Sequence, residues 1–128
     1  MSEVSSEEPY TRKQKGADGE KAAQQYLTAQ GYRIIECNWR CRSGELDIIA
    51  EYGEVLVFIE VRSRSGSPLQ GTPEESVDER KIRQVRATAQ VYMHMKNAYE
   101  RRVSFDVITV MLNEGRSIAS LHHIREAF

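Results

Sequence analysis

The run from Val55 to Val61 constrains the fold of this chain more than any other segment. Its sequence is VLVFIEV, which is apolar at every position except Glu60. β-branched and aromatic residues favour strands, and apolar residues at successive positions are typical of a strand that is covered on both faces. The run therefore predicts the central strand of a sheet with a layer packed on each side.

The surrounding segments predict an α/β (α+β) domain. A helical period begins at Gly16, with Ala23, Tyr26 and Leu27 as its apolar stripe and Gly31 after its last turn. A second helix is expected from Thr72, its N-cap, to about Lys96. Strand-like runs are expected at 33–40, 45–51, 54–62, 103–111 and 117–124. A polar loop is expected at Ser63 to Gly71. The order αβββαββ predicts one mixed sheet flanked by helices.

Length and charge narrow the functional classes. The 128 residues suffice for one domain, which we place at 15–128, after a polar and mobile leader at 1–14. The chain has no long uncharged apolar run and no secretory signal, so we expect a cytoplasmic protein that does not enter a membrane. A net charge of −1 argues against a protein that coats DNA through bulk positive charge.

Acidic residues on two neighbouring strands are the main candidates for a site. Glu45 and Asp47 share one face of their strand, and Glu60 and Arg62 share one face of the next. A tight turn at Tyr52-Gly53 would place Glu45 opposite Glu60, with Asp47 on the diagonal. Gathered carboxylates repel one another unless a cation is bound, and carboxylate oxygens suit Mg²⁺ or Mn²⁺.

Two further observations bear on this site. Glu20 lies on the apolar stripe of the first helix, so its carboxylate is expected to point inward. Basic residues could bind phosphates near the acids, namely Arg40, Arg62, Arg64, Arg83 and Arg86. The alternatives are ordinary: the acids could be a solvated edge paired with Arg62 or Arg64, and the basic run of the second helix could be a solvated face. Asp106 is a weaker candidate, and His94, His122 and His123 are expected to be surface or packing residues.

The motifs themselves resemble a known family. Gly-Glu-Leu-Asp-Ile-Ile-Ala at 44–50 and Val-Phe-Ile-Glu-Val-Arg-Ser-Arg at 57–64 are similar to the YraN-like bacterial proteins. That family is related to archaeal Holliday-junction resolvases and to the PD-(D/E)xK nucleases. Further similarities are Gly16, Gly19-Glu20, Asn38, Arg40, the segment 71–77, Lys81 and Phe105-Asp106. The resemblance implies a restriction-endonuclease-like fold, Asp47 and Glu60 as metal ligands, Glu20 as a supporting residue, and a homodimer.

One position departs from the nuclease motif. The motif ends in lysine, whereas this chain has Arg62, which stays protonated and cannot act as a base. Lys81 is a candidate substitute, although it could equally be a surface lysine. We therefore expect catalytic residues Asp47, Glu60, Arg62 and Lys81 in a Mg²⁺- or Mn²⁺-dependent endonuclease that cuts DNA. The alternatives are a non-catalytic nucleic-acid-binding module and a protein-interaction domain.

Overall fold

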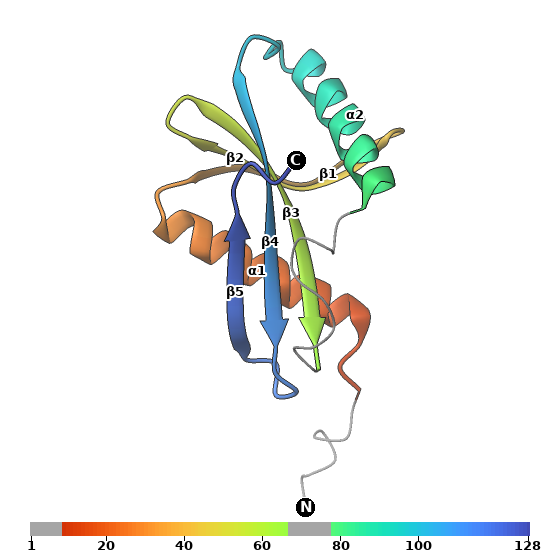
Figure 1. Ribbon diagram of the computed structural model, residues 1–128, viewed down its shortest axis with the longest axis vertical. Helices are drawn as coiled ribbons and strands as arrows, with labels where there is room; N and C mark the ends of the chain where they lie inside the picture. The colour runs from red at the N-terminus through yellow and green to blue at the C-terminus, as the bar shows by residue number, and fades with distance from the viewer. Residues whose placement is uncertain (1–8, 67–77) are drawn as a thin grey trace, which may run out of the picture.

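The computed structural model describes residues 9–66 and 78–128 of the chain, which form one mixed sheet with two helices (Figure 1). The elements are α1 (Arg12–Ala29), β1 (Arg33–Cys41), β2 (Gly44–Tyr52), β3 (Val55–Ser65), α2 (Glu79–Met95), β4 (Arg102–Leu112) and β5 (Ile118–Ile124). The predicted order αβββαββ is confirmed, and it is compatible with a restriction-endonuclease-like fold. No helix in these two ranges is long and apolar enough to cross a membrane.

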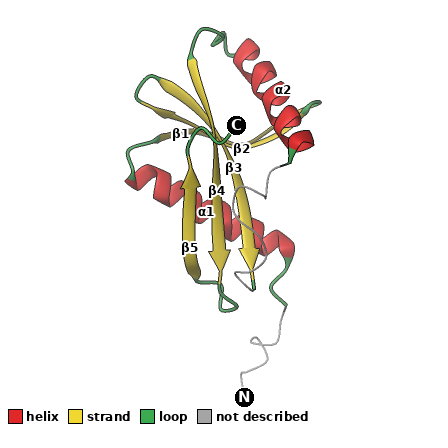
Figure 2. Cartoon of the chain, in the orientation of Figure 1, coloured by secondary structure: helices red, strands yellow, loops and turns green. Residues whose placement is uncertain are grey.

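The strand that the sequence marks as central lies in the middle of the sheet. The strands follow the order β1-β2-β3-β4-β5, and β3 pairs with β2 antiparallel and with β4 in parallel (Figure 2). Parallel neighbours cannot be joined by a tight turn, so the chain leaves the sheet after β3 and returns through α2. The prediction that both faces of Val55 to Val61 are covered is confirmed by two hydrophobic clusters.

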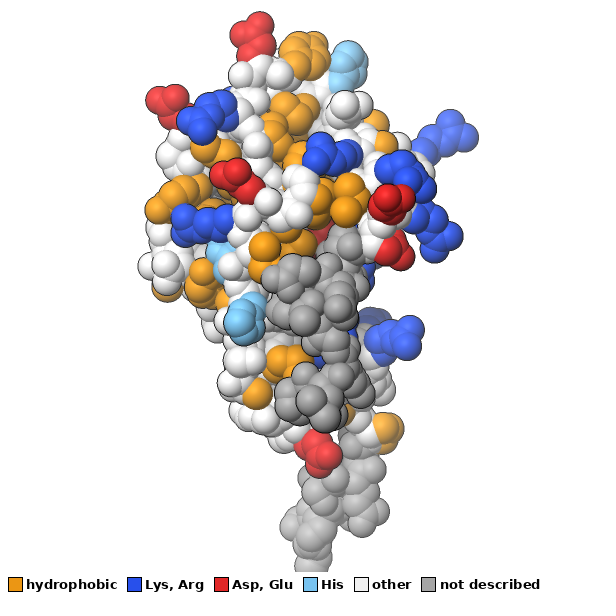
Figure 3. All heavy atoms as spheres, viewed as in Figure 1, with side chains coloured by type: hydrophobic (Ala, Val, Ile, Leu, Met, Phe, Trp, Pro, Cys, Tyr) orange, Lys and Arg blue, Asp and Glu red, His pale blue; other side chains and the backbone are white. Residues whose placement is uncertain are grey.

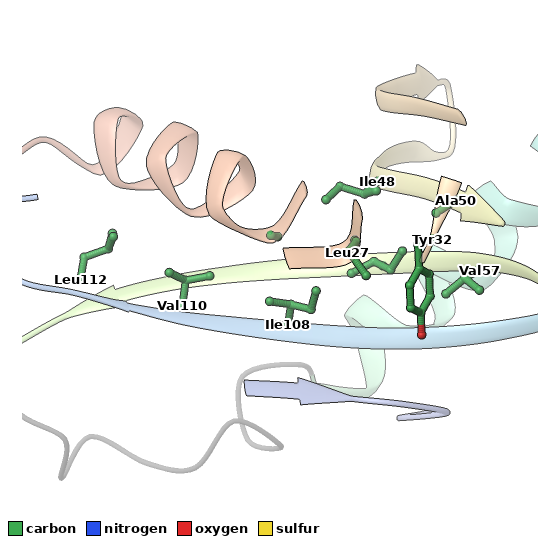
Figure 4. Close-up of a cluster of buried hydrophobic side chains, with 10 residues drawn as sticks. Leu27, Tyr32, Ile48, Ala50, Val57, Ile108, Val110 and Leu112 are labelled. Atoms are coloured by element: carbon green, nitrogen blue, oxygen red, sulfur yellow. The ribbon is translucent and has the colours of Figure 1, made fainter. Parts of the chain in front are cut away.

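Each helix covers one face of β3. On the α1 face, Leu27 packs with Ile48 and Ile108, which come from β2 and β4 (Figure 4). On the α2 face, Val85 and Tyr92 pack with residues of β2 and β3. Because β3 alternates between these clusters, Glu60 follows Phe58 and points toward the α2 side, where an apolar residue would otherwise continue the core.

Both helices begin elsewhere than predicted. Thr11 caps α1 through a capping box with Gln14, so the helix starts at Arg12 and not at Gly16. The N-cap of α2 is Asp78, which accepts a hydrogen bond from the Lys81 amide. The predicted start at Thr72 is therefore wrong for this helix, and Thr72 itself lies outside the described residues, as do residues 1–8 of the leader predicted at 1–14. The prediction that Gly31 follows the end of α1 is confirmed, since Gly31 has φ +95°.

The β2–β3 hairpin also differs in register. Tyr52 pairs with Val55, so the two turn residues are Gly53 and Glu54 and not Tyr52 and Gly53. This moves the register by two residues, and the predicted pairing of Glu45 with Glu60 is wrong. A shift of two leaves every side chain on its predicted face, because strand side chains repeat with a period of two. In addition, β3 continues through Ser65, where a loop beginning at residue 63 was expected; residues 67–71 of that loop lie outside the described chain.

The helix α1 approaches β3 most closely at Gly19. A Cβ atom on Gly19 would lie 1.8 Å from Ser63 Oγ and 3.0 Å from Ser63 Cβ. Rotation of the Ser63 hydroxyl would relieve the first contact but not the second. The helix sits this near the strand only because residue 19 has no side chain.

We expect Gly19→Ala to lower the free energy of unfolding by about 1–3 kcal/mol, the usual cost of overpacking a close-packed contact. Gly16→Ala is the matched control, since a Cβ there meets nothing within 4 Å and alanine favours the helix. Denaturant titration of both variants tests this. Equal stability of the two variants would show that the contact with Ser63 does not limit the approach of α1.

Candidate active site

The site begins where β2 separates from β3. The ladder of paired residues between these strands ends at Ile48 and Ile59. Beyond this point the backbone N–H groups of β3 that face β2 have no carbonyl acceptor on the β2 backbone. Val61 donates its N–H instead to Asp47 Oδ2, at 2.9 Å. A buried amide needs a partner, and this carboxylate supplies it. Asp47 is thereby held at the side of β3, next to Glu60.

Glu60 is the second carboxylate of the site and is only 3% exposed. Its Oε1 lies 3.6 Å from Nζ of Lys81, which comes from the first turn of α2. Because the side chain of Asp78 caps this turn through the Lys81 amide, the position of Lys81 is fixed by the start of the helix. The structure thus places the predicted residue Lys81 beside a predicted acid, although the two are far apart in sequence.

The two acids face a cavity of about 590 Å³ between α1, the end of β3 and the start of α2. Its charged lining residues are Glu20, Asp47, Glu60, Arg12, Lys15, Arg62, Arg64 and Lys81. Six of the predicted site residues therefore meet around one space. Figure 3 shows Lys and Arg side chains along the edge of the molecule where α2 begins, with Asp and Glu side chains between them.

Burial and neighbouring negative charges raise the pKa values of the two carboxyl groups. Burial raises the pKa of Glu60 to about 7, and the negative charge of Asp47 adds to this, against the opposing effects of Lys81 and Arg62. Burial also raises the pKa of Asp47, although the hydrogen bond from Val61 and the charge of Lys81 oppose the rise. The protein therefore holds two acids where their charged forms are unfavourable, which is a feature of sites built to bind a cation or to transfer protons.

Glu20 reaches the same cavity from α1. Its Oε1 accepts a hydrogen bond from Nδ2 of Asn38, at 3.0 Å. Burial is the main cause that raises the pKa of Glu20, and the charges of Asp47 and Glu45 raise it further. Asn38 adopts φ 55°, a left-handed conformation that asparagine tolerates better than most residues. The inward orientation predicted for Glu20 agrees with this half-buried position.

Several predicted residues are not among those that line the cavity. Glu45 Oε2 instead accepts a hydrogen bond from Nε of Arg40, at 3.1 Å. Arg83 forms an exposed ion pair with Glu79, one helical turn away. The guanidinium of Arg86 lies over the ring of Phe105, 5.0 Å from its centroid. For each of these side chains the structure provides a partner elsewhere on the surface.

Asp106 lies away from the cavity lining, in a buried network on β4 and β5. Its Oδ2 is 2.7 Å from His123 Nε2, and Nδ1 of the same ring is 2.9 Å from the Tyr26 hydroxyl. Ser104 donates a further hydrogen bond to Asp106, at 2.6 Å. The network joins β4, β5 and α1, and it agrees with the packing role expected for His123.

Arg12 and Lys15 are lining residues that the sequence reading missed. The predicted leader spans 1–14 and the predicted helix begins at Gly16, so Arg12 lies outside any predicted element and Lys15 lies ahead of the predicted helix. The signal that could have found them is the pattern Thr11-x-x-Gln14, a capping box that stands ahead of the apolar stripe.

Replacing Glu60 by glutamine is expected to stabilise the metal-free protein at neutral and alkaline pH. The pKa of Glu60 is raised from its ordinary 4.5 to about 7. Between these values the native state binds more protons than the unfolded chain, so stability falls as the pH rises. Glutamine cannot ionise, and the advantage of Glu60→Gln should grow through this window by at most about 3 kcal/mol.

Denaturant titrations at several pH values, with a chelator present, measure this difference. Glu114→Gln serves as control because Glu114 is exposed in the turn between β4 and β5, and its stability should follow that of the wild type. If the Glu60→Gln curve ran parallel to the wild-type curve across the whole window, the raised pKa would be contradicted.

Comparison with known proteins places the chain in a family. A family model described as the uncharacterised protein family UPF0102 matches residues 19–110. A UPF0102 protein of Moorella thermoacetica is 45% identical, over 92% of this chain and 98% of its own length. UPF0102 proteins of Persephonella marina and Rhodococcus opacus are 44% and 42% identical, over 89% and 88% of this chain and 92% and 94% of their own lengths. The chain therefore belongs to the UPF0102 family, which is the YraN family that its acidic motifs resemble.

Proposed function

We propose that this protein is a Mg²⁺- or Mn²⁺-dependent endonuclease that hydrolyses phosphodiester bonds in DNA. One observation carries the proposal: the buried carboxylate of Glu60 and the half-buried carboxylate of Asp47 face a cavity whose other charged walls are largely cationic. Acids at the centre suit a metal ion, and surrounding cations suit the phosphates of a nucleic-acid strand. A protein-interaction surface would require neither.

The residues of the cavity fit a hard divalent ion. Asp47 and Glu60 would hold it, and both offer carboxylate oxygens; the lining residues that the structure describes include no histidine or cysteine. Within 9–66 and 78–128 no group of three or more Asp, Glu, His or Cys is arranged to enclose an ion. A pair of carboxylates is nevertheless typical for Mg²⁺, which keeps several waters and binds substrate phosphates directly. When bound, such an ion polarises the phosphate and lowers the pKa of a bound water.

The basic residues of the cavity have distinct tasks in this proposal. Arg62 has a buried Nε with no hydrogen-bond partner in the part of the chain described here, and a guanidinium offers only donors. It would donate to a phosphate oxygen and stabilise the charge that develops there. Lys81, beside Glu60, would supply the lysine that the motif lacks at Arg62.

A second candidate function rests on Arg62 itself. If the position requires lysine for turnover, the chain is a non-catalytic module that binds nucleic acid with the same cavity. Branched or junction DNA is the substrate that the family resemblance implies in either case. The two functions differ in cleavage and not in binding.

Wild-type protein is expected to cleave junction, flap or linear DNA in the presence of Mn²⁺ or Mg²⁺ and to stop when a chelator is added. Asp47→Asn and Glu60→Gln should abolish cleavage, because each removes one of the two anionic ligands. Electrophoresis of end-labelled DNA measures the products. Since Glu60→Gln is expected to be at least as stable as the wild type at neutral pH, its loss of activity would not reflect unfolding.

The matched control is Glu114→Gln, an exposed carboxylate that is not among the residues lining the cavity, which should cleave like the wild type. Cleavage that persists undiminished in Asp47→Asn would reject the assignment of the site. Binding of the same DNA without cleavage by any active metal would favour the non-catalytic module.

Lys81→Gln is expected to lower the cleavage rate by roughly 10²-fold or more, the size of losing one positioned charge at the reacting phosphate. Arg83→Gln is the control, because Arg83 lies on the same helix but pairs with exposed Glu79. Single-turnover rates at saturating protein separate this effect from binding. Equal cleavage rates for the two variants would mean that Lys81 does not provide the positive charge that the motif lysine provides in other nucleases.

A further inference from the structure

The helix α1 contains two glycines, and the structure accounts for only one of them. Gly19 is required by the close approach to Ser63. Gly16 lies in the same helix, and a Cβ on it would meet nothing within 4 Å. Glycine inside a helix costs about 0.5–1 kcal/mol relative to alanine. Neither packing nor backbone conformation explains Gly16, but Gly16 does line the cavity that holds Asp47 and Glu60.

Two cations stand beside Gly16 on the same wall. Arg12 and Lys15 both line the cavity, and neither forms an ion pair with any residue in the described ranges. The acid nearest along the helix, Asp18, is already bound by Arg116, with Nε to Oδ2 at 3.0 Å. The Lys15 ammonium lies 5.5 Å from the centre of the Tyr10 ring.

The positive charges of Arg12 and Lys15 do not stabilise the helix α1 that carries them. Its first turn contains no acidic residue, although acids there would be favoured by the helix dipole and bases are disfavoured. The capping box already engages two amides at this helix end, because Thr11 Oγ1 accepts from the Gln14 amide and Gln14 Oε1 accepts from the Thr11 amide. The groups that this wall offers to a ligand are the cationic side chains of Arg12 and Lys15.

We propose that Arg12, Lys15 and the bare surface at Gly16 form a subsite for a nucleic-acid phosphate that flanks the phosphate cut at Asp47 and Glu60. The two cations bind the phosphate, and the missing side chain at Gly16 lets the sugar–phosphate backbone lie against the helix. The inference rests on the proposed function, since it assigns a second part of the same substrate to the opposite wall of the cavity. It requires a polymer with successive phosphates.

The charges are tested through the salt dependence of binding. Anisotropy of a fluorescently labelled DNA duplex is measured against increasing salt, with every variant in an Asp47→Asn background that cannot cut. The logarithm of the binding constant falls as the logarithm of the salt concentration rises, with a negative slope. Each of Arg12→Gln and Lys15→Gln should make this slope less steep by about 1, which is the effect of one lost phosphate contact. Lys13→Gln is the matched control, because Lys13 is exposed on the same turn but does not line the cavity.

The open surface at Gly16 is tested by introducing a glutamine side chain at each of two adjacent positions of α1. Gly16→Gln places it in the cavity, whereas Ala17→Gln places it on an exposed position outside the lining. We expect Gly16→Gln to weaken binding of the duplex and Ala17→Gln to leave it unchanged. Thermal unfolding of both variants checks that neither substitution disrupts the helix, which is expected because nothing stands near the Gly16 Cβ direction.

The outcomes separate this subsite from the proposed function. Metal-dependent cleavage that is lost in Asp47→Asn, combined with slopes for Arg12→Gln and Lys15→Gln equal to that of Lys13→Gln, overturns the subsite and leaves the nuclease. Unchanged affinity in Gly16→Gln likewise overturns it. Absence of salt-dependent binding by the parent protein overturns both.

Discussion

The hydrogen bond from the Val61 amide to Asp47 is the interaction on which the site depends. A hairpin normally satisfies its amides along its whole length, and here the ladder stops at Ile48 and Ile59. The Asp47 carboxylate accepts the hydrogen bond that a backbone carbonyl of β2 would otherwise accept. The strand β2 can therefore separate from β3 while the Val61 N–H keeps an acceptor. The separation opens the space beside Glu60, and the same bond fixes one of the two acids that face it.

Keeping Asp47 and Glu60 together works against stability. Desolvation disfavours the charged form of both acids, the charge of Asp47 adds to this effect at Glu60, and Lys81 offsets the conflict only in part. Replacement of such a pair by apolar residues would extend the core formed by Phe58 and its neighbours. Conflicts of this kind between local preference and fold are expected at functional sites, and this one coincides with the cavity.

The element order, the central strand and the shared side of Asp47 and Glu60 could be predicted because they depend on patterns of short period, whereas Lys81 became a candidate through the family motif and its place beside the buried stripe of α2. Strand alternation and the helical repeat place side chains on faces even when the register is wrong by two residues, as it is for Glu45. The starts of both helices were missed for a different reason. Capping depends on a few polar side chains, and the signals at Thr11 and Asp78 are weaker in sequence than the apolar stripes that follow them.

The place of Arg12 and Lys15 in the cavity could not be read from the sequence, although the capping box at Thr11 could have assigned both residues to the helix. Their place in the cavity depends on how α1 crosses the sheet, which is a matter of packing between distant segments. The sequence shows only that they are basic and lie at the start of an amphipathic helix. Their proximity to Glu60 becomes visible once the helix is seated on β3.

The contact of Gly19 with Ser63 has a mechanical consequence. At this point helix and strand touch almost backbone to backbone, and close-packed contacts of this kind do not compress or slide. The contact therefore fixes the spacing between α1 and β3, which form two walls of the cavity, at a point one helical turn from Gly16. A ligand that enters the cavity meets walls whose separation is set by packing within the protein and not by the ligand.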